Sequence, residues 1–289
     1  MKKILITGAT GYIGSHVTRI LKENGNEIIG WDINFHGEHN DTAKYCDKFL
    51  LQDITDAKIK GEYDAVVHLA GRSVVPQSLK EPAEYYRVNT MGTDNILNNI
   101  KTPHILFAGT SSSWAMASPY ARSKVAAEDI IKQKANGYTI FRFFNVSGTD
   151  GIHRQLGKPS HLIRIAAMAA AGKLEEVTIY GTDYETRDGT CIRDYIHVVD
   201  LANAISKSIE NGPLNTPYEC LGSKQGWTVK EVISIMKTVT GKDFKVIEGD
   251  RRAGDSVANI VDNLSSHVTL TKSIEDMCLD QYNLEITRK

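Results

Sequence analysis

A glycine-rich turn near the N-terminus constrains this chain more than any other feature. Lys3–Thr7 is an apolar run typical of a strand covered on both faces, and apolar residues recur at helical spacing after the turn. Between them stand Gly8, Gly11 and Gly14. Glycines let the backbone turn sharply, so a pyrophosphate can approach the free N–H groups of a helix N-terminus. The pattern favours a dinucleotide-binding unit over a plain turn.

Further apolar runs alternate with helical patterns along the first half of the chain. Strands are expected at residues 27–31, 48–51, 65–69, 104–107 and 138–144. This alternation predicts an α/β fold with a doubly wound parallel (Rossmann) sheet. The rhythm changes after Asn145, so we expect a first domain at 1–146, with a return segment near 191–211, and a smaller C-terminal α/β substrate domain at 147–289. Within the second domain, helices are expected at 162–171 and 229–240.

Two carboxylates follow predicted strands on the same edge of the sheet. Asp32 lies about 20 residues past the glycine turn, where a carboxylate accepts hydrogen bonds from the adenosine ribose. A carboxylate there repels a 2′-phosphate, so the position favours NAD over NADP. The alternative is that Asp32 merely begins a loop. Asp53 follows the third predicted strand and is expected beside the adenine.

The segment Ser118–Lys124 places a tyrosine and a lysine four residues apart. Ser118 and Pro119 suit a helix start, so Tyr120 and Lys124 should project together. An ammonium beside a phenol lowers the tyrosine pKa and prepares it to exchange a proton with a hydroxyl. Thr110 ends the preceding strand, where open α/β sheets bind ligands. The alternative is an ordinary amphipathic helix with two surface residues.

Composition excludes several other classes of function. The net charge is −1 and no basic run stands out, so nucleic acid is not an expected partner. No stretch approaches the ~20 apolar residues that span a bilayer, so we expect no membrane association. The four cysteines are scattered without metal-ligand spacing, as reduced thiols of a cytoplasmic protein would be. No metal site is expected, and Gly-x-Ser-x-Gly is absent.

Ordered motifs across nearly the whole chain resemble one known family. ITGATGYIGSH, HLAG, SPYARSK, FRFFN, DGTCIRDYIHVVDLA and RRAGD occur in the family's order. The chain resembles an extended short-chain dehydrogenase/reductase, specifically of the UDP-glucose (UDP-galactose) 4-epimerase type. The DGTCIRDYIHVVDLA segment carries most of this specificity, because the glycine turn and Tyr-x-x-x-Lys establish only the superfamily.

The resemblance implies which residues bind the two ligands and which catalyse the reaction. Catalysis falls to Tyr120 as base, Lys124 as its partner, and Thr110 as a proton relay. Positions that match NAD contacts are Gly8, Gly11, Tyr12, Ile13, Gly14, Asp32, Asn34, Asp53, Ile54, Leu69, Ala70, Gly71, Asn89, Tyr120, Lys124 and Phe144. Positions that match UDP-sugar contacts are Asn145, His161, Leu162, Tyr180, Arg193, Arg252 and Asp255.

The implied reaction is epimerisation at carbon 4 of a UDP-hexose through a transient 4-keto sugar, with NAD as cofactor. The hexose is glucose or galactose, or their N-acetylated forms if Asn259 stands where some relatives carry a bulky residue. The resemblance also implies a homodimer formed through helices 83–99 and 120–134. Arg193 and Arg252 would hold the pyrophosphate. The alternative interpretation, for each arginine taken by itself, is that it forms an ion pair at the surface.

The chain departs from the family pattern between Thr110 and Tyr120. Only ten positions separate them, whereas relatives carry a longer polar loop, which leaves the choice of sugar open. A nucleotide-sugar 4,6-dehydratase is the nearest rival, but that family follows the threonine with Asp-Glu, and this chain has Ser111-Ser112. A decarboxylase and a non-catalytic NAD-sensing protein are weaker alternatives.

Overall fold

The computed structural model describes residues 1–33, 40–56, 60–153, 155, 157–252 and 254–287. The chain divides into two compact units. Unit 1 comprises Met1–Phe143 and Ala202–Glu219, and unit 2 comprises Phe144–Leu201 and Cys220–Lys289. These limits lie a few residues from the expected boundary at 146, and the segment that returns to unit 1 begins later than residue 191. Each unit is described by itself below.

Unit 1 is built on a parallel sheet whose strand order is that of a doubly wound fold. The order is β12-β8-β7-β5-β1-β2-β3, with β1 at a point where the chain reverses direction across the sheet. The pairs from β8 to β3 are all parallel. The strands are β1 (Lys3–Thr7), β2 (Glu27–Asp32), β3 (Lys48–Leu51), β5 (Ala65–His68), β7 (Ile105–Thr110), β8 (Tyr138–Phe143) and β12 (Glu219–Leu221). The expected Rossmann sheet is confirmed.

Burial follows from the composition of the central strands. Every residue of β5 and β7 is buried, and so is every residue of β1 after Lys3. Apolar side chains on both faces, such as Leu5, Val66 and Phe107, form the core that the covering helices complete. The polar exceptions, Thr7 and His68, lie at the carboxyl ends of their strands, where ligands bind in this fold.

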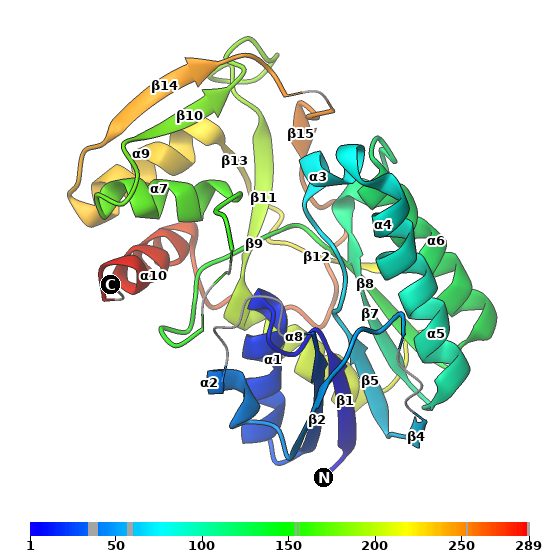
Figure 1. Ribbon diagram of the computed structural model, residues 1–289. Coiled ribbons are helices and arrows are strands. Elements are labelled where there is room, and N and C mark those ends of the chain that lie inside the picture. Colours follow the sequence, from blue (N-terminus) through cyan, green and yellow to red (C-terminus); the bar gives the residue numbers. More distant parts are fainter. Residues whose placement is uncertain (34–39, 57–59, 154, 156, 253, 288–289) are drawn as a thin grey trace. The chain divides into compact units, whose positions relative to one another are not determined.

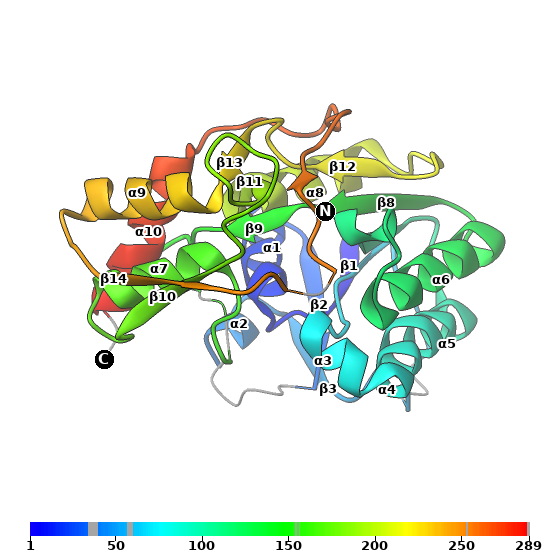
Figure 2. The same ribbon diagram turned by 90° about the horizontal axis from the view of Figure 1, so that it is seen from above.

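Helices cover both faces of this sheet. Figures 1 and 2 show α4, α5 and α6 together on one face and α1 on the other. The residues of α8 that belong to unit 1 lie on the α1 face, where Asn24 donates to Ser206 (Nδ2–Oγ 2.9 Å). The bounds are α1 (Tyr12–Glu23), α4 (Pro82–Tyr86), α5 (Gly92–Asn99), α6 (Pro119–Lys134) and α8 (Val198–Asn211).

The expected single helix at 83–99 is wrong in one respect. A π-helical turn, Arg87–Met91, separates α4 from α5. Within this turn, the side-chain amide of Asn89 bonds both backbone groups of Arg72. Turns of this kind occur often at functional sites.

Unit 2 holds three helices packed around their own core. They are α7 (Leu162–Ala170), α9 (Val229–Thr240) and α10 (Ile274–Thr287), and their shared core includes Ile163, Met236 and Met277. The expected helices at 162–171 and 229–240 are confirmed, whereas α10 was not foreseen. Its apolar residues follow no clear amphipathic stripe.

Short strands complete unit 2. β10 (Glu176–Tyr180) pairs in parallel with β14 (Lys245–Gly249). β11 (Ile192–His197) pairs with β9 (Asn145–Ser147), β13 (Gly226–Thr228) and β15 (Ala258–Asn259). The small elements of unit 1 are α2 (Asn40–Ala43), α3 (Val75–Lys80), β4 (Gly61–Glu62), β6 (Ile100–Lys101) and the 3₁₀ turn Ser111–Ser113. In the part of the chain that the structure describes, no helix has the length and hydropathy to cross a membrane.

Candidate functional site

The glycine turn brings the start of α1 against two strands. Gly8 has φ +72°, and a Cβ there would lie 2.7 Å from the amide nitrogen of Ala70. A Cβ on Gly14 would lie only 1.9 Å from the carbonyl oxygen of Gly8. The helix begins after Gly11, which offers no side chain to cap it. The N-terminal dipole of α1 therefore faces the turn with no protein carboxylate in its first turn, as an anion site requires.

Asp32 lies at the end of β2, next to this turn. Its carboxylate accepts hydrogen bonds from the backbone amides of Thr10 (2.9 Å) and Ile33 (2.7 Å). These bonds fix the carboxylate beside the glycine turn, and the side chain stays half-buried rather than enclosed. This placement suits a group that receives ribose hydroxyls.

Asp53 is held as a carboxylate by its own loop. Desolvation alone would raise its pKa, but hydrogen bonds from the Thr55 amide and hydroxyl, with the charge of Arg87, hold the pKa below its usual value. Arg87 lies 3.4 Å from Asp53 and also pairs with Glu84 (2.8 Å). The neighbouring Ile54 is 4% exposed and packs in the core, so its side chain offers no polar group to a ligand.

A buried histidine joins the strand ends to the π-helical turn. The Thr93 hydroxyl donates to the carbonyl of Asn89 (2.7 Å), so it accepts from His68 Nε2–H (2.9 Å). Nδ1 of His68 then accepts from the Thr7 hydroxyl (2.7 Å), which itself accepts from the Ala70 amide (3.3 Å). Burial, assisted by the charge of a nearby lysine, lowers the pKa of His68 to about 3, so the ring is neutral.

The side chain of Asn89 joins the segment after β5 to α6. It accepts from the Arg72 amide (2.8 Å) and donates to the Arg72 carbonyl (3.0 Å) and the Ser123 hydroxyl (3.0 Å). Ser123 in turn donates to the carbonyl of Tyr120 (2.8 Å). A Cβ on Gly71 would lie 2.9 Å from the Asn89 amide oxygen, so the chain passes closely here.

Helix α6 begins as its sequence predicts. Ser118 caps α6 by accepting from the amide of Ala121 (3.2 Å), and Pro119 occupies the first turn. Tyr120 follows at once, with its ring edge-on to Tyr85 at 6.4 Å between centroids. These contacts hold the phenol at the start of the helix.

The electrostatics of Tyr120 differ from the sequence-based expectation. Burial raises its pKa, and a hydrogen bond with Thr110 opposes the rise. Lys124 is not among the groups that shift it, so the expected lowering by the ammonium is not found in the protein alone. Thr110 ends β7, is 7% exposed, and also accepts from the amide of Ser112 (3.2 Å).

Lys124 is a buried cation. Its side chain is 5% exposed, and its ammonium lies 4.1 Å from the centroid of the Phe107 ring. Burial lowers its pKa to about 8, and the charge of Glu128 opposes that change. Within the described residues it forms no ion pair, so its donors remain available to hydroxyl groups of a ligand.

These features fit a dinucleotide without any further assumption. The uncapped helix start suits a pyrophosphate, Asp32 suits the adenosine ribose, and Lys124 suits the second ribose. Tyr12 and Ile13 form the first turn of α1 beside Gly14, and Leu69 and Ala70 line the exit of β5. Asn34 lies outside the described residues.

Unit 2 brings some of the candidate sugar-nucleotide residues together. Arg193, on β11, pairs with Asp255 (3.5 Å) and donates to the carbonyl of Ser256 (2.9 Å). The guanidinium of Arg252 stacks over the Tyr180 ring, 3.8 Å from its centroid. Both arginines therefore have protein partners, as the surface ion-pair alternative also expects, and both belong to unit 2.

The remaining candidates occupy separate places in unit 2. Asn145 lies on β9 and donates to the carbonyl of Asp194 (2.8 Å). His161 precedes α7 and Leu162 begins it, and the side chain of His161 is exposed. Phe144 is 6% exposed, and its amide donates to the carbonyl of Leu221 (3.1 Å).

Sequence reasoning missed the role of Asp194 in the RDY motif. Its buried carboxylate accepts from the amides of Ser223 (2.7 Å), Lys224 (3.0 Å) and Val261 (3.1 Å). Desolvation raises its pKa despite these bonds. Asp194 thus joins three segments of unit 2 beside Arg193. An aspartate between an arginine and an apolar strand was the available signal.

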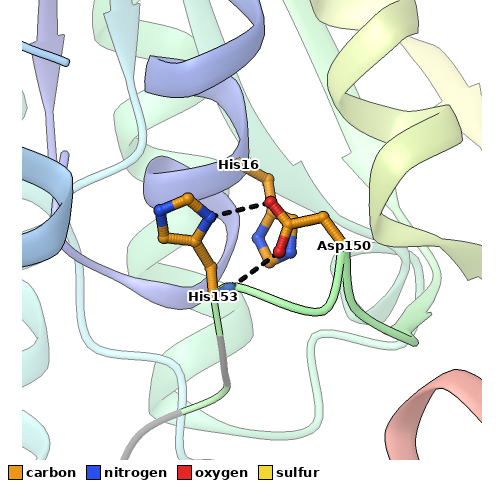
Figure 3. A group of neighbouring side chains, drawn as sticks. All are labelled: His16, Asp150 and His153. Atoms are coloured by element: carbon orange, nitrogen blue, oxygen red, sulfur yellow. Dashed lines mark hydrogen bonds and ion pairs between the residues drawn. The ribbon is translucent and has the colours of Figure 1, made fainter. Parts of the chain in front are cut away.

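Asp150 and His153 form a small hydrogen-bonded turn in unit 2 (Figure 3). Asp150 accepts from the amides of Ile152 (2.9 Å) and His153 (2.7 Å), and its carboxylate lies 2.8 Å from Nδ1 of His153. His16, also drawn, belongs to α1 of unit 1, where its Nδ1 lies 2.7 Å from the carbonyl oxygen of Tyr12. Two side chains of one unit do not make a metal site, and the expectation of no metal stays a prediction.

The glycine turn, the carboxylate of Asp32 beside it and the Tyr-x-x-x-Lys helix define a nucleotide-binding protein of the extended short-chain dehydrogenase/reductase class. Residues 4–220 match the NAD dependent epimerase/dehydratase family. A UDP-glucose 4-epimerase from Halalkalibacterium halodurans is 34% identical over 304 aligned positions, which cover 92% of this chain and 89% of that protein.

Solved structures agree with this assignment. The UDP-Glc/GlcNAc 4-epimerase from Campylobacter jejuni is similar with a TM-score of 0.80 at 32% identity, over 100% of both chains. A UDP-glucose 4-epimerase from Bifidobacterium longum, in complex with NAD⁺ and UDP, is similar with a TM-score of 0.87 at 26% identity, over 98% of both chains. The chain belongs to the NAD dependent epimerase/dehydratase family.

The buried charge of Lys124 leads to a prediction about stability. In the cofactor-free protein at pH 7, Lys124→Met should raise the free energy of unfolding by ~1–3 kcal/mol. The reason is that the ammonium of Lys124 is removed from water only in the folded state, which destabilises that state. Above pH 8 the folded lysine loses its proton, while the unfolded lysine keeps it up to about 10.5. The stability of the native protein should therefore rise relative to the variant across that window.

Urea unfolding at pH 7 and pH 10 measures this difference. Lys101→Met is the matched control, because Lys101 is exposed and pairs only with Glu62 at the surface (2.9 Å). Two results would show that burial does not destabilise the charged ammonium. One is a Lys124→Met variant that is less stable than the native protein at pH 7. The other is a difference in the free energy of unfolding between the two proteins that does not change with pH.

Proposed function

We propose that this protein is an NAD-dependent 4-epimerase of a UDP-hexose. The observation that carries the proposal is the pair Tyr120 and Lys124 at the start of α6, with Thr110 hydrogen-bonded to Tyr120. This arrangement occurs in a chain that is similar over nearly its whole length to curated UDP-glucose 4-epimerases. When bound, NAD supplies a reversible hydride acceptor at carbon 4.

The protein residues handle the proton and the position of the sugar. Tyr120 takes the proton of the 4-hydroxyl as carbon 4 is oxidised to the ketone, and returns it after the sugar has turned. Thr110 orients the phenol through their hydrogen bond. Since burial raises the pKa of Tyr120, the phenol needs positive charge nearby to act as a base, and Lys124 is the cation one helical turn away.

The nucleotide end of the substrate is assigned to unit 2. Arg193 and Arg252 are the cations we propose for the pyrophosphate, with Asp255 holding Arg193 and Tyr180 supporting Arg252. Asn145, His161 and Leu162 are proposed to contact the UDP moiety. Guanidinium groups suit this task because they bind phosphate oxygens in a bidentate manner.

N-acetylated hexoses are a second candidate substrate class. The similar Campylobacter jejuni structure is titled a UDP-Glc/GlcNAc 4-epimerase. Asn259 lies on β15, and we propose that it stands where a bulkier residue would oppose an acetamido group. A 4,6-dehydratase is disfavoured, because Ser111 and Ser112 follow Thr110 and provide no acid–base pair for elimination.

We also propose a homodimer in the cytoplasm. Exposed apolar side chains lie along the α4–α5 segment: Met91 is 63% exposed and Tyr86 is 37% exposed. Ile131, on the second helix of the proposed interface, packs in the core of unit 1. The four cysteines are free thiols, which is consistent with a reducing compartment.

The activity itself tests the first proposal. The NAD-loaded protein should interconvert UDP-glucose and UDP-galactose, and parallel assays with UDP-GlcNAc determine whether the acetamido group is accepted. Tyr120→Phe should lower kcat by about 10²–10⁴ and keep its NAD, because only the proton transfer is lost. Tyr86→Phe is the control and should keep full activity. Near-native turnover by Tyr120→Phe would remove this residue from the role of base.

The dimer proposal predicts a change in mass. Met91→Glu places a charge within the exposed apolar surface of the α4–α5 segment and should shift the protein from dimer to monomer in light scattering. Leu270→Glu, at an exposed position of unit 2, should leave the mass unchanged. A native protein that is monomeric at assay concentration, or a Met91→Glu variant that stays dimeric, would contradict the proposed interface.

A further inference from the structure

Glu128 lies on the same face of α6 as Tyr120 and Lys124, one turn beyond the lysine. It is fully buried, at 0% exposure. A buried carboxylate so close to a buried ammonium would normally form an ion pair with it. In the structure it does not: the Lys124 ammonium lies over the Phe107 ring, and both oxygens of Glu128 are bound elsewhere.

The partner of Glu128 is Arg142, from β8. Nη2 of Arg142 lies 2.7 Å from Oε2 of Glu128, and Nε lies 3.2 Å from Oε1. Gly109 makes room for this bidentate pair, because a Cβ there would lie 2.9 Å from Oε1 of Glu128 and 3.1 Å from Cγ of Arg142. Gly109 and Phe107 face the same side of β7, so the pair and the lysine occupy adjacent places on one strand.

The other side of Arg142 is covered by aromatic rings. Its guanidinium carbon lies 3.7 Å from the centroid of the Tyr218 ring and 5.6 Å from that of Trp114. The indole of Trp114 donates to the Tyr218 hydroxyl (3.1 Å). Trp114 belongs to the short segment between Thr110 and Tyr120. That segment therefore helps to hold the arginine in place.

We propose that Arg142 is a positioning residue for the proposed epimerase reaction. It holds the carboxylate of Glu128 in an ion pair, so that Lys124 stays directed toward the cofactor ribose and Tyr120. Without Arg142, the buried carboxylate of Glu128 is left with Lys124 as the nearest cation on its own helix. The lysine then turns back along α6 to pair with it, and in the NAD-loaded enzyme Tyr120 lacks the ammonium that we propose assists its phenolate.

Other charged groups around Lys124 are few. Tyr120 and Glu128 lie on its own helix, His68 faces it from β5, and Arg142 reaches Glu128 from β8. Burial lowers the pKa of His68 to about 3, so the ring stays neutral in the working range, and only the Glu128–Arg142 pair can redistribute charge. Burial lowers the pKa of Lys124 to about 8, and the charge of Glu128 opposes this lowering. The pKa of Lys124 should therefore respond to the loss of Arg142.

The test compares Arg142→Met, Glu128→Gln and the double variant as NAD-loaded enzymes. Arg142→Met should lower kcat about tenfold or more at pH 7 with little change in KM, and move the acidic limb of the pH–rate profile to higher pH. The double variant should recover most of the lost rate, because no carboxylate remains to capture the lysine. Lys101→Met is the control for removal of a surface cation.

A second readout does not depend on turnover. The ¹³Cε resonance of Lys124, assigned with Lys124→Arg, is titrated in the NAD-loaded protein. Arg142→Met should raise the lysine pKa by about one unit or more, and the added Glu128→Gln should reverse the rise. Absence of epimerase activity in the native protein would refute the proposed function, and this titration would still test the positioning role.

Two results would overturn the inference. One is a lysine pKa in Arg142→Met that is unchanged or lower, which would mean that Glu128 takes up a proton instead of capturing the lysine. The other is a double variant that regains thermal stability but not kcat, which would assign to Arg142 a merely structural role.

Discussion

The packing of α6 on β7 is the contact on which the site depends. Phe107 supports the Lys124 ammonium and Gly109 leaves space for the Glu128–Arg142 pair. Burial disfavours the charge of Lys124, the nearby Glu128 carboxylate opposes that effect, and a ligand can satisfy the donors of the ammonium. Burial of the ammonium lowers the stability of the fold, as is common at functional sites. The same packing brings Tyr120 next to Thr110 at the end of β7.

A chain of hydrogen bonds connects the carboxyl ends of β1 and β5 to α6. The Ala70 amide donates to the Thr7 hydroxyl, which bonds His68. His68 bonds the Thr93 hydroxyl, which donates to the carbonyl of Asn89, and the Asn89 side chain bonds Ser123. Each member is buried or half-buried and each group has a defined donor and acceptor role. Buried networks with complete pairing fix one geometry, because any rearrangement leaves an unpaired polar group. The glycine turn and α6 are thus held in a fixed position relative to each other within unit 1.

The Rossmann sheet, the capped start of α6 and the helices at 162–171 and 229–240 were predictable, because they depend on local patterns. The π-helical turn was not, since Asn89 stabilises it by contacts with Arg72 and Ser123, which are distant in sequence. The pairing of Glu128 with Arg142 was hidden for the same reason. The pKa of Tyr120 was misjudged because spacing alone shows the neighbouring charge but not the desolvation of the phenol. The roles of the proposed ligand-binding residues stay predictions, and Asn34 lies outside the described residues.

Transfer of the carbon 4 hydrogen most directly tests the central claim, that this chain oxidises and reduces one carbon of the sugar without net change. UDP-glucose carrying deuterium at carbon 4 is incubated with the NAD-loaded enzyme in ordinary water. The account predicts that deuterium is retained at carbon 4 of the UDP-galactose formed, because the same hydride returns to the opposite face. Loss of the deuterium to water, or its retention with no inversion at carbon 4, would contradict it.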